Sequence, residues 1–211
     1  MHSQFWNREF PHNGNHEADL TEILDSGIEN FYTISVLKPQ DLLVAIQRAL
    51  HPDRSKYAQI AHDLHISTGT AHRAMVSARE ARLVSANSDA VRPNLLEFLI
   101  CGARYAFFPI STGGNTRGMP TAASAPSIIE QLAGGSSVVW PWPSGRVRGE
   151  GLEPIYPTVP LVAEGDPAFY VVLAALDLLR IGTARERSIA SEILRDRIFS
   201  RHEQADPHRD A

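Results

Sequence analysis

Residues 57–75 read YAQIAHDLHISTGTAHRAM, and this stretch decides the fold of the region around it. Apolar positions recur at helical spacing on both sides of a polar turn, which predicts two short helices packed on each other. The apolar side chains expected between the helices are Ile60, Ala61, Leu64, Ile66, Ala71 and Ala74. Ser67 stands where the second helix would begin, and its hydroxyl can accept a backbone amide that is otherwise unpaired there.

Two features of this stretch are unusual. His65 occupies the turn position at which glycine is most common, so the backbone must turn there with a side chain present. Ala71 and Ala74 are smaller than the branched aliphatic residues usual at such positions, which indicates that the two helices approach closely. An ordinary helical hairpin with no binding role is the alternative.

The flanking residues extend this pair of helices to a larger unit. Residues 39–50 predict a helix with proline in its first turn and apolar side chains on one side. Residues 83–85 and 90–92 predict two short strands joined by a polar turn at residues 87–89. Three helices followed by a small hairpin form the winged version of the helix-turn-helix motif, which binds DNA through its second motif helix.

The segment AREARLVS, residues 78–85, resembles the passage from helix to wing in bacterial winged helix-turn-helix regulators of the MarR-like group. The resemblance covers about residues 36–93. It implies a sequence-specific DNA-binding protein, usually a homodimer on a palindromic operator. Arg82 stands where this family usually has a glycine.

The motif also predicts which side chains contact double-stranded DNA. We expect Thr68, Gly69 and Arg73 to face base edges, because Gly69 permits close approach and Arg73 can form two hydrogen bonds with guanine. The other expected contacts, with phosphates or with the flanking groove, are Lys56, Ser67, Thr70, His72, Ser77, Arg82 and Arg92.

The charge distribution favours the same region. Residues 36–93 carry eight Lys or Arg and five acidic residues, a net charge of +3. Residues 1–35 have a net charge of −5 and residues 94–211 a net charge of −2. Neutralising phosphates requires a local basic patch, and only the middle region is basic overall. A solvated surface of mixed charge is the alternative explanation.

Length and composition set outer limits. With 211 residues, 43% of them hydrophobic, the chain can form two small domains or one domain with appendages. Cys101 is the single cysteine, which excludes an intrachain disulfide, and a buried, unreactive thiol is expected. The sequence shows neither a signal-peptide pattern nor an apolar stretch long enough to cross a bilayer, so we expect a cytoplasmic protein without a membrane partner.

These patterns divide the chain into four regions. Residues 1–35 predict an acidic, partly flexible arm with a short helix at about residues 20–26, and residues 36–93 predict the winged helix-turn-helix domain. Residues 94–199 predict a helical, Pro/Gly-rich C-terminal domain for dimerisation or partner binding, and residues 200–211 predict a flexible tail. The expected fold class is mainly α with a small β-wing (α+β).

The C-terminal region begins with an apolar segment. Asn94 can cap a helix that runs to residue 107 or 108 and is apolar nearly all round, so it should be buried in a second core or in a subunit interface. Residues 109–167 then hold nine of the 14 prolines and nine of the 14 glycines, which predicts an irregular, extended strap on the same or a neighbouring chain.

Two further helices are expected near the end of the chain. Asp166 is a start signal for the first, and Gly182 should end it. Thr183 and Glu186 predict a capping box at the start of the second. Arg117 and Arg180 can form buried salt bridges near Asp177.

The C-terminal region also resembles uncharacterised bacterial proteins that pair a winged helix with blocks such as LLEFLICGARYAFF and VWPWPSGRVRGEGLEPIYPTVP. This resemblance covers about residues 36–199. It implies a regulator with a dedicated second domain, and it brings no ligand or catalytic role.

No catalytic residue, metal site or cofactor is expected. Residues 112–118 are rich in glycine but lack the Lys-Ser/Thr ending of a phosphate-binding loop. His62 and His65 lie three residues apart, with no third ligand at zinc spacing.

The working hypothesis is a homodimeric transcriptional regulator, a repressor in its simplest form, that binds double-stranded DNA. One alternative is an antitoxin-like module that binds a partner protein encoded nearby and represses its own operon. Another is a ligand-sensing regulator with a pocket near Trp140 and Trp142, or an unrecognised enzyme.

Overall fold

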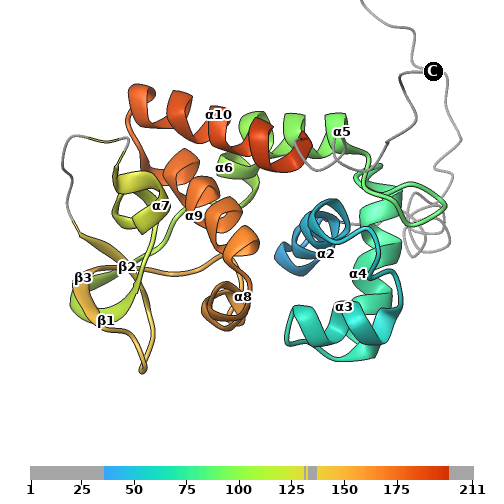
Figure 1. Cartoon of the computed structure of the whole chain (residues 1–211), viewed down its shortest axis with the longest axis horizontal. Helices are drawn as coiled ribbons and strands as arrows, with labels where there is room; N and C mark the ends of the chain where they lie inside the picture. Colours follow the sequence, from blue (N-terminus) through green and yellow to red (C-terminus); the bar gives the residue numbers. More distant parts are fainter. Residues whose placement is uncertain (1–35, 131, 133–136, 200–211) are drawn as a thin grey trace, which may run out of the picture. The chain divides into compact units, whose positions relative to one another are not determined.

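A computed structural model of the chain describes residues 36–130, 132 and 137–199 (Figure 1). Helices dominate these residues, and one small three-stranded sheet accompanies them, in agreement with the expected α+β class. The predicted acidic arm at residues 1–35, its short helix and the predicted tail at residues 200–211 lie outside the described residues. Within the described part, no helix has both the length and the apolar character needed to cross a membrane.

Helix α2 (Pro39–Leu50) has the predicted bounds and is buried along almost its entire length. Its first turn is closed by the backbone N–H of Lys38, which donates to the Asp41 carboxylate at 2.8 Å. Residues 41–50 are all buried, because α2 contacts α3, α4, α5, α9 and α10.

Helices α3 (Tyr57–Asp63) and α4 (Thr68–Glu80) form the predicted pair. The Ser67 hydroxyl accepts a hydrogen bond from the backbone N–H of Thr70 at 3.0 Å, as expected of an N-cap. His65 has a φ of 52°. The turn thus requires the left-handed conformation, which glycine adopts more easily than histidine. The inner face of α4 is made of small side chains and one methionine, which we call the alanine face: Ala71, Ala74, Met75 and Ala78.

The hairpin after α4 is shorter than predicted. A single antiparallel bridge joins Val84 to Ala90, and Arg82 adopts the left-handed conformation, with φ 58°, at the position where glycine was expected. The predicted second strand is wrong at Arg92, where α5 (Arg92–Glu97) already begins. The buried guanidinium of Arg48 fixes the hairpin turn, because its Nε donates to the Ser88 carbonyl at 2.7 Å.

The segment that follows was predicted as one buried helix from Asn94. Instead, α5 continues into a π-helical turn, η1 (Phe98–Gly102), and the short α6 (Ala103–Ala106). Asn94 does not cap, and its amide donates to the Arg82 carbonyl at 2.9 Å.

Only one side of this segment is buried within the chain. Leu95, Leu99 and Ala103 form the buried side, whereas Tyr105 is 70% exposed and Phe108 is 67% exposed. The prediction of a buried thiol was wrong, because Cys101 lies on the exposed side.

Residues 109–165 do not form an irregular strap, so that prediction was wrong. They fold into three strands with short helices between and after them: β1 (Ser111–Pro120), η2 (Ala122–Ser124), α7 (Pro126–Ile129), β2 (Val138–Pro141), β3 (Val147–Leu152) and α8 (Val159–Gly165). Strand β1 is antiparallel to β2 and β3, which are parallel to each other.

The glycines permit these strands rather than prevent them. A Cβ on Gly118 would lie 2.0 Å from the Trp140 carbonyl oxygen, and one on Gly149 would lie 2.4 Å from that of Ser137. Only glycine allows the strands to approach so closely.

Helices α9 (Pro167–Ile181) and α10 (Ala184–Phe199) match the predicted end of the chain. The Asp166 carboxylate accepts from the backbone N–H of Ala168 at 2.8 Å, and Gly182 ends α9. The capping box of α10 is present, because the Thr183 N–H donates to Glu186 at 2.7 Å. One continuous core joins α2 and α4 to α9 and α10.

Asp177 on α9 fastens the sheet through buried polar contacts. Its carboxylate accepts from Thr121 Oγ1 at 2.9 Å, from Trp140 Nε1 at 2.5 Å and from Arg180 Nη1 at 2.6 Å. Burial raises the pKa of Asp177, while the Arg180 charge and the three hydrogen bonds act in the opposite direction. The predicted salt bridge is confirmed for Arg180, whereas the prediction was wrong for Arg117, which is exposed and forms no ion pair with a described residue. Asp177, Thr121, Trp140 and Arg180 are called the Asp177 cluster.

Candidate nucleic-acid interface

The outer edge of α4, opposite the alanine face, is polar except at Val76. Its exposed residues follow helical spacing along the helix: Gly69, His72, Arg73, Val76 and Glu80. The basic side chains lie in the N-terminal half, whereas the carboxylate of Glu80 lies at the C-terminal end. The N-terminal half of α4 is therefore the part that suits an anionic partner, and the helix dipole adds to this preference.

Arg73 lies back toward the start of α4. Its Nη2 donates to Thr70 Oγ1 at 3.3 Å, and Thr70 Oγ1 lies 2.9 Å from the hydroxyl of Ser67. A Cβ at Gly69 would lie 3.6 Å from Arg73 Nη1, an ordinary contact distance, so this arrangement of Arg73 does not itself require glycine. Among the described residues, the other N–H groups of the guanidinium have no acceptor.

The remaining predicted residues around α4 differ in how available they are. Lys56 and Thr68 are exposed, and Ser77 is half-buried. The His72 ring packs edge-on against Tyr57, with 5.0 Å between ring centroids, so its orientation is fixed by α3. The Ser67 hydroxyl is already engaged as the helix cap.

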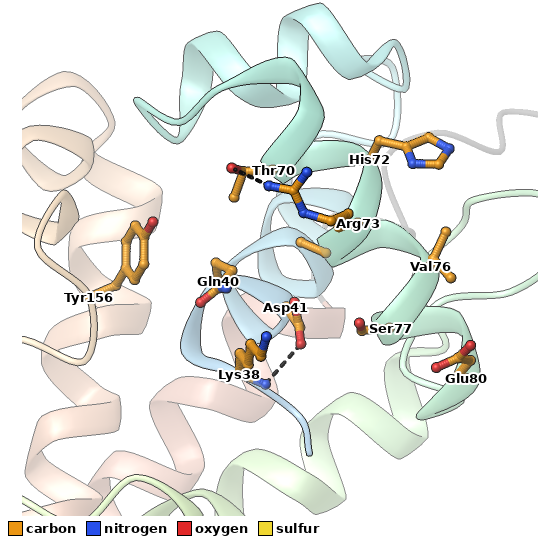
Figure 2. A pocket seen from close by; sticks show the side chains of 11 residues that line it. Lys38, Gln40, Asp41, Thr70, His72, Arg73, Val76, Ser77, Glu80 and Tyr156 are labelled. Carbon is orange, nitrogen blue, oxygen red and sulfur yellow. Dashed lines mark hydrogen bonds between the residues drawn. The ribbon is translucent and has the colours of Figure 1, made fainter. Parts of the chain in front are cut away.

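A groove of about 610 Å³ runs beside α4 (Figure 2). One wall is α4 itself, with Thr70, Arg73 and Ser77, and the opposite wall contains Lys38 and Tyr156. The sequence did not predict these two residues as neighbours of α4. Tyr156 follows β3, far along the chain, and no local pattern signals that it would lie here.

The structure separates the two arginines predicted at the wing. Arg82 is exposed and lines a different hollow of about 480 Å³ with Asn94 and Cys101. Arg92 is turned inward, and its guanidinium donates to the backbone carbonyl of Ile198 at the end of α10. Burial lowers the pKa of Arg92. This engagement within the protein argues against the predicted contact of Arg92 with a DNA groove.

Two other basic side chains near α4 are engaged within the protein. Arg54 forms an ion pair with Asp63 at 3.0 Å, and Arg79 donates to the Ser88 hydroxyl at 2.5 Å. In the part of the chain that the structure describes, no group of three or more His, Cys, Asp or Glu side chains could hold a metal ion.

The predicted ligand pocket at the tryptophans does not match their surroundings. Trp140 is 1% exposed and belongs to the Asp177 cluster. Trp142 is half-buried, and the grooves described above are lined by other residues.

Comparisons of the chain with models of known protein families, with curated protein sequences and with solved structures found no match. The chemistry of α4 and its surroundings is therefore what points to a function.

Proposed function

We propose that this protein is a sequence-specific transcriptional regulator that binds double-stranded DNA with α4, as a winged helix-turn-helix protein does. The observation that carries the proposal is the division of α4 into two faces. Its alanine face is buried against the core, whereas its first two turns expose Thr68, Gly69, His72 and Arg73. Within these two turns the exposed edge carries hydrogen-bonding groups and no large apolar side chain, which suits the polar floor of a major groove.

The charge gradient along α4 supports one direction of entry. Glu80 would be repelled by phosphates, so the C-terminal end of α4 should point away from the duplex. Arg73 and Gly69 would then lie closest to the bases, which matches the use of N-terminal residues in known recognition helices. Lys56, next to the start of α3, is placed for a phosphate on the same side.

A homodimer completes this proposal. The exposed aromatic side chains Tyr105 and Phe108 favour a second copy as a partner of the segment after α5. Two copies would place their α4 helices on half-sites about 34–36 Å apart, one turn of the duplex. Occupation of such an operator would repress transcription.

The test is selection of bound duplexes from a random pool at a stated salt concentration, followed by affinity measurements with Arg73→Ala. We expect this variant to lose about 1–3 kcal/mol of binding free energy on the selected sequence and to relax the preference at one base pair. Arg185→Ala, which removes an exposed arginine from the first turn of α10, is the matched control and should leave the preference unchanged.

Two results would contradict the proposal. An equal loss for Arg73→Ala on every duplex would make this residue a phosphate contact instead of a base contact. Electrostatic attraction to DNA is strongest at low ionic strength. If the wild-type protein binds no duplex under that condition, the proposal is wrong.

A further inference from the structure

Two arginines face each other on the exposed side of the sheet. In the antiparallel pairing of β1 with β3, Arg117 lies directly opposite Arg148. Both side chains are exposed, and so is Arg146, two residues before Arg148. Directly opposed residues in an antiparallel pair have Cβ atoms about 4.5–5.5 Å apart, and like charges at this distance destabilise the sheet.

In the described part of the chain, neither arginine of this pair forms an ion pair. None of the ion pairs there includes Arg117, Arg146 or Arg148. The three strands and the turn at residues 142–146 contain one carboxylate, Glu150, which shares the face of Arg148 two residues away, so three arginines stand against one acidic side chain there. The three arginines, which we call the arginine face, thus form a local excess of positive charge in a C-terminal half that is acidic overall.

The surroundings of the arginine face suit a polyanion better than a protein. Protein interfaces bury aromatic and aliphatic side chains at their centre. Beside the arginine face, Val147, which is 38% exposed, is the one exposed large apolar side chain of β1 and β3. The neighbouring tip of β1 is polar and open, because a Cβ on Gly113 or Gly114 would have no atom within 4 Å.

We propose that the arginine face binds phosphates of duplex DNA that flank the segment contacted by α4. Guanidinium groups bind phosphate oxygens through two parallel hydrogen bonds, and a phosphate between Arg117 and Arg148 would convert their repulsion into attraction. This inference rests on the proposed function and extends the DNA surface from α4 to the sheet. The sheet would contribute to the affinity for DNA but not to the preference for a sequence, because phosphate contacts carry no sequence information.

The experiment compares wild type with a triple variant that combines Arg117→Gln, Arg146→Gln and Arg148→Gln. Affinities are measured over a range of salt concentrations for a duplex of about one helical turn and for one of about three turns around the selected sequence. We expect the triple variant to bind the long duplex about tenfold more weakly and the slope of log K against log salt to fall by about 2–3, since each lost phosphate contact contributes about 0.9. The short duplex should be bound as by wild type.

The matched control combines Arg185→Gln, Arg195→Gln and Arg197→Gln, three exposed positions on α10, and removes the same charge. An equal loss with the control would show an effect of net charge and overturn the inference. The triple variant should also unfold no more easily than wild type, because it removes like charges from an exposed surface.

Failure of this inference is distinguishable from failure of the proposed function. If Arg73→Ala loses its base preference while the triple variant binds like wild type, α4 contacts DNA and the arginine face does not. If the triple variant loses affinity for single-stranded RNA and keeps its affinity for duplex DNA, the arginine face has a different partner and the inference is wrong.

Discussion

Helix α4 and the three-stranded sheet are attached to the rest of the protein by different kinds of contact. Helix α4 packs through its alanine face, which is apolar and buried. The sheet in addition makes polar contacts with α9, through the Asp177 cluster and through the Tyr170 hydroxyl, which donates to the Pro120 carbonyl at 2.7 Å. The comparison shows that α4 is sensitive to added volume, whereas the sheet is sensitive to the loss of a single partner.

The largest effect is expected at the sheet. Asp177→Ala would leave Trp140 Nε1, Thr121 Oγ1 and the Arg180 guanidinium buried without their acceptor. Removing one partner of a buried ion pair costs about 3–5 kcal/mol, to be measured by chemical denaturation. Hydrogen exchange should show the loss of protection first in β1 and β2 and last in α4. Asp196→Ala, at an exposed position of α10, is the control. A cost for Asp177→Ala as small as that of the control would mean that apolar packing alone holds the sheet.

A smaller effect is expected at α4. Ala74 is 1% exposed, and Ala74→Leu would insert three carbon atoms where the helices touch. Overpacking of this kind costs about 1–3 kcal/mol and should displace α4, so thermal stability and DNA binding would both fall. Ala81→Leu makes the same substitution at the exposed end of α4 and should change neither. Full stability in Ala74→Leu would contradict close packing at the alanine face.

The smallest expected effect is on the pH dependence of the free energy of unfolding, and it tests only the attachment of the sheet. Burial raises the pKa of Tyr170 from its ordinary value of 10.0 to about 12. Because the unfolded chain releases this proton at lower pH than the folded protein, the free energy of unfolding should fall as pH rises from about 10 to about 12.

Tyr170→Phe should remove this part of the pH dependence and cost about 1 kcal/mol at neutral pH through the lost hydrogen bond to Pro120. The measurement is urea denaturation of both proteins at several alkaline pH values. Tyr105→Phe, at a residue that is 70% exposed, should follow wild type throughout. Parallel curves for wild type and Tyr170→Phe would show that Tyr170 ionises as it does in water.

How much of the fold could be predicted differs between the same two regions. Around α4 the signals are local: the Ser67 cap and the small residue Ala71 lie within a few positions of the contacts that they form. In the sheet, Trp140 and Asp177 are 37 residues apart, and neither flank indicates that they meet. From the sequence, the density of glycines predicts an irregular region and not strands. The close approach of β2 to Gly118 is a tertiary contact, so no local pattern in the sequence indicates it.

The candidate site divides in the same way. Exposed positions on α4 follow from helical periodicity, so His72 and Arg73 could be placed from sequence. Arg92 could not, because its partner, the Ile198 carbonyl, comes from the other end of the described chain. Tyr156 could not be predicted as a neighbour of α4 for the same reason, because it comes from a distant part of the chain.

The burial of α2 determines how the protein can be dissected. This helix contacts α3 and α4 on one flank and α9 and α10 on another, and His51 at its end lies 2.5 Å from the Asp166 carboxylate. A fragment that stopped near residue 93 would lose the contacts of α2 with α9 and α10 and would expose apolar side chains of α2 to water. Residues 36–93 should therefore not fold as an independent domain, and a chimeric protein that contains them must carry the last two helices as well.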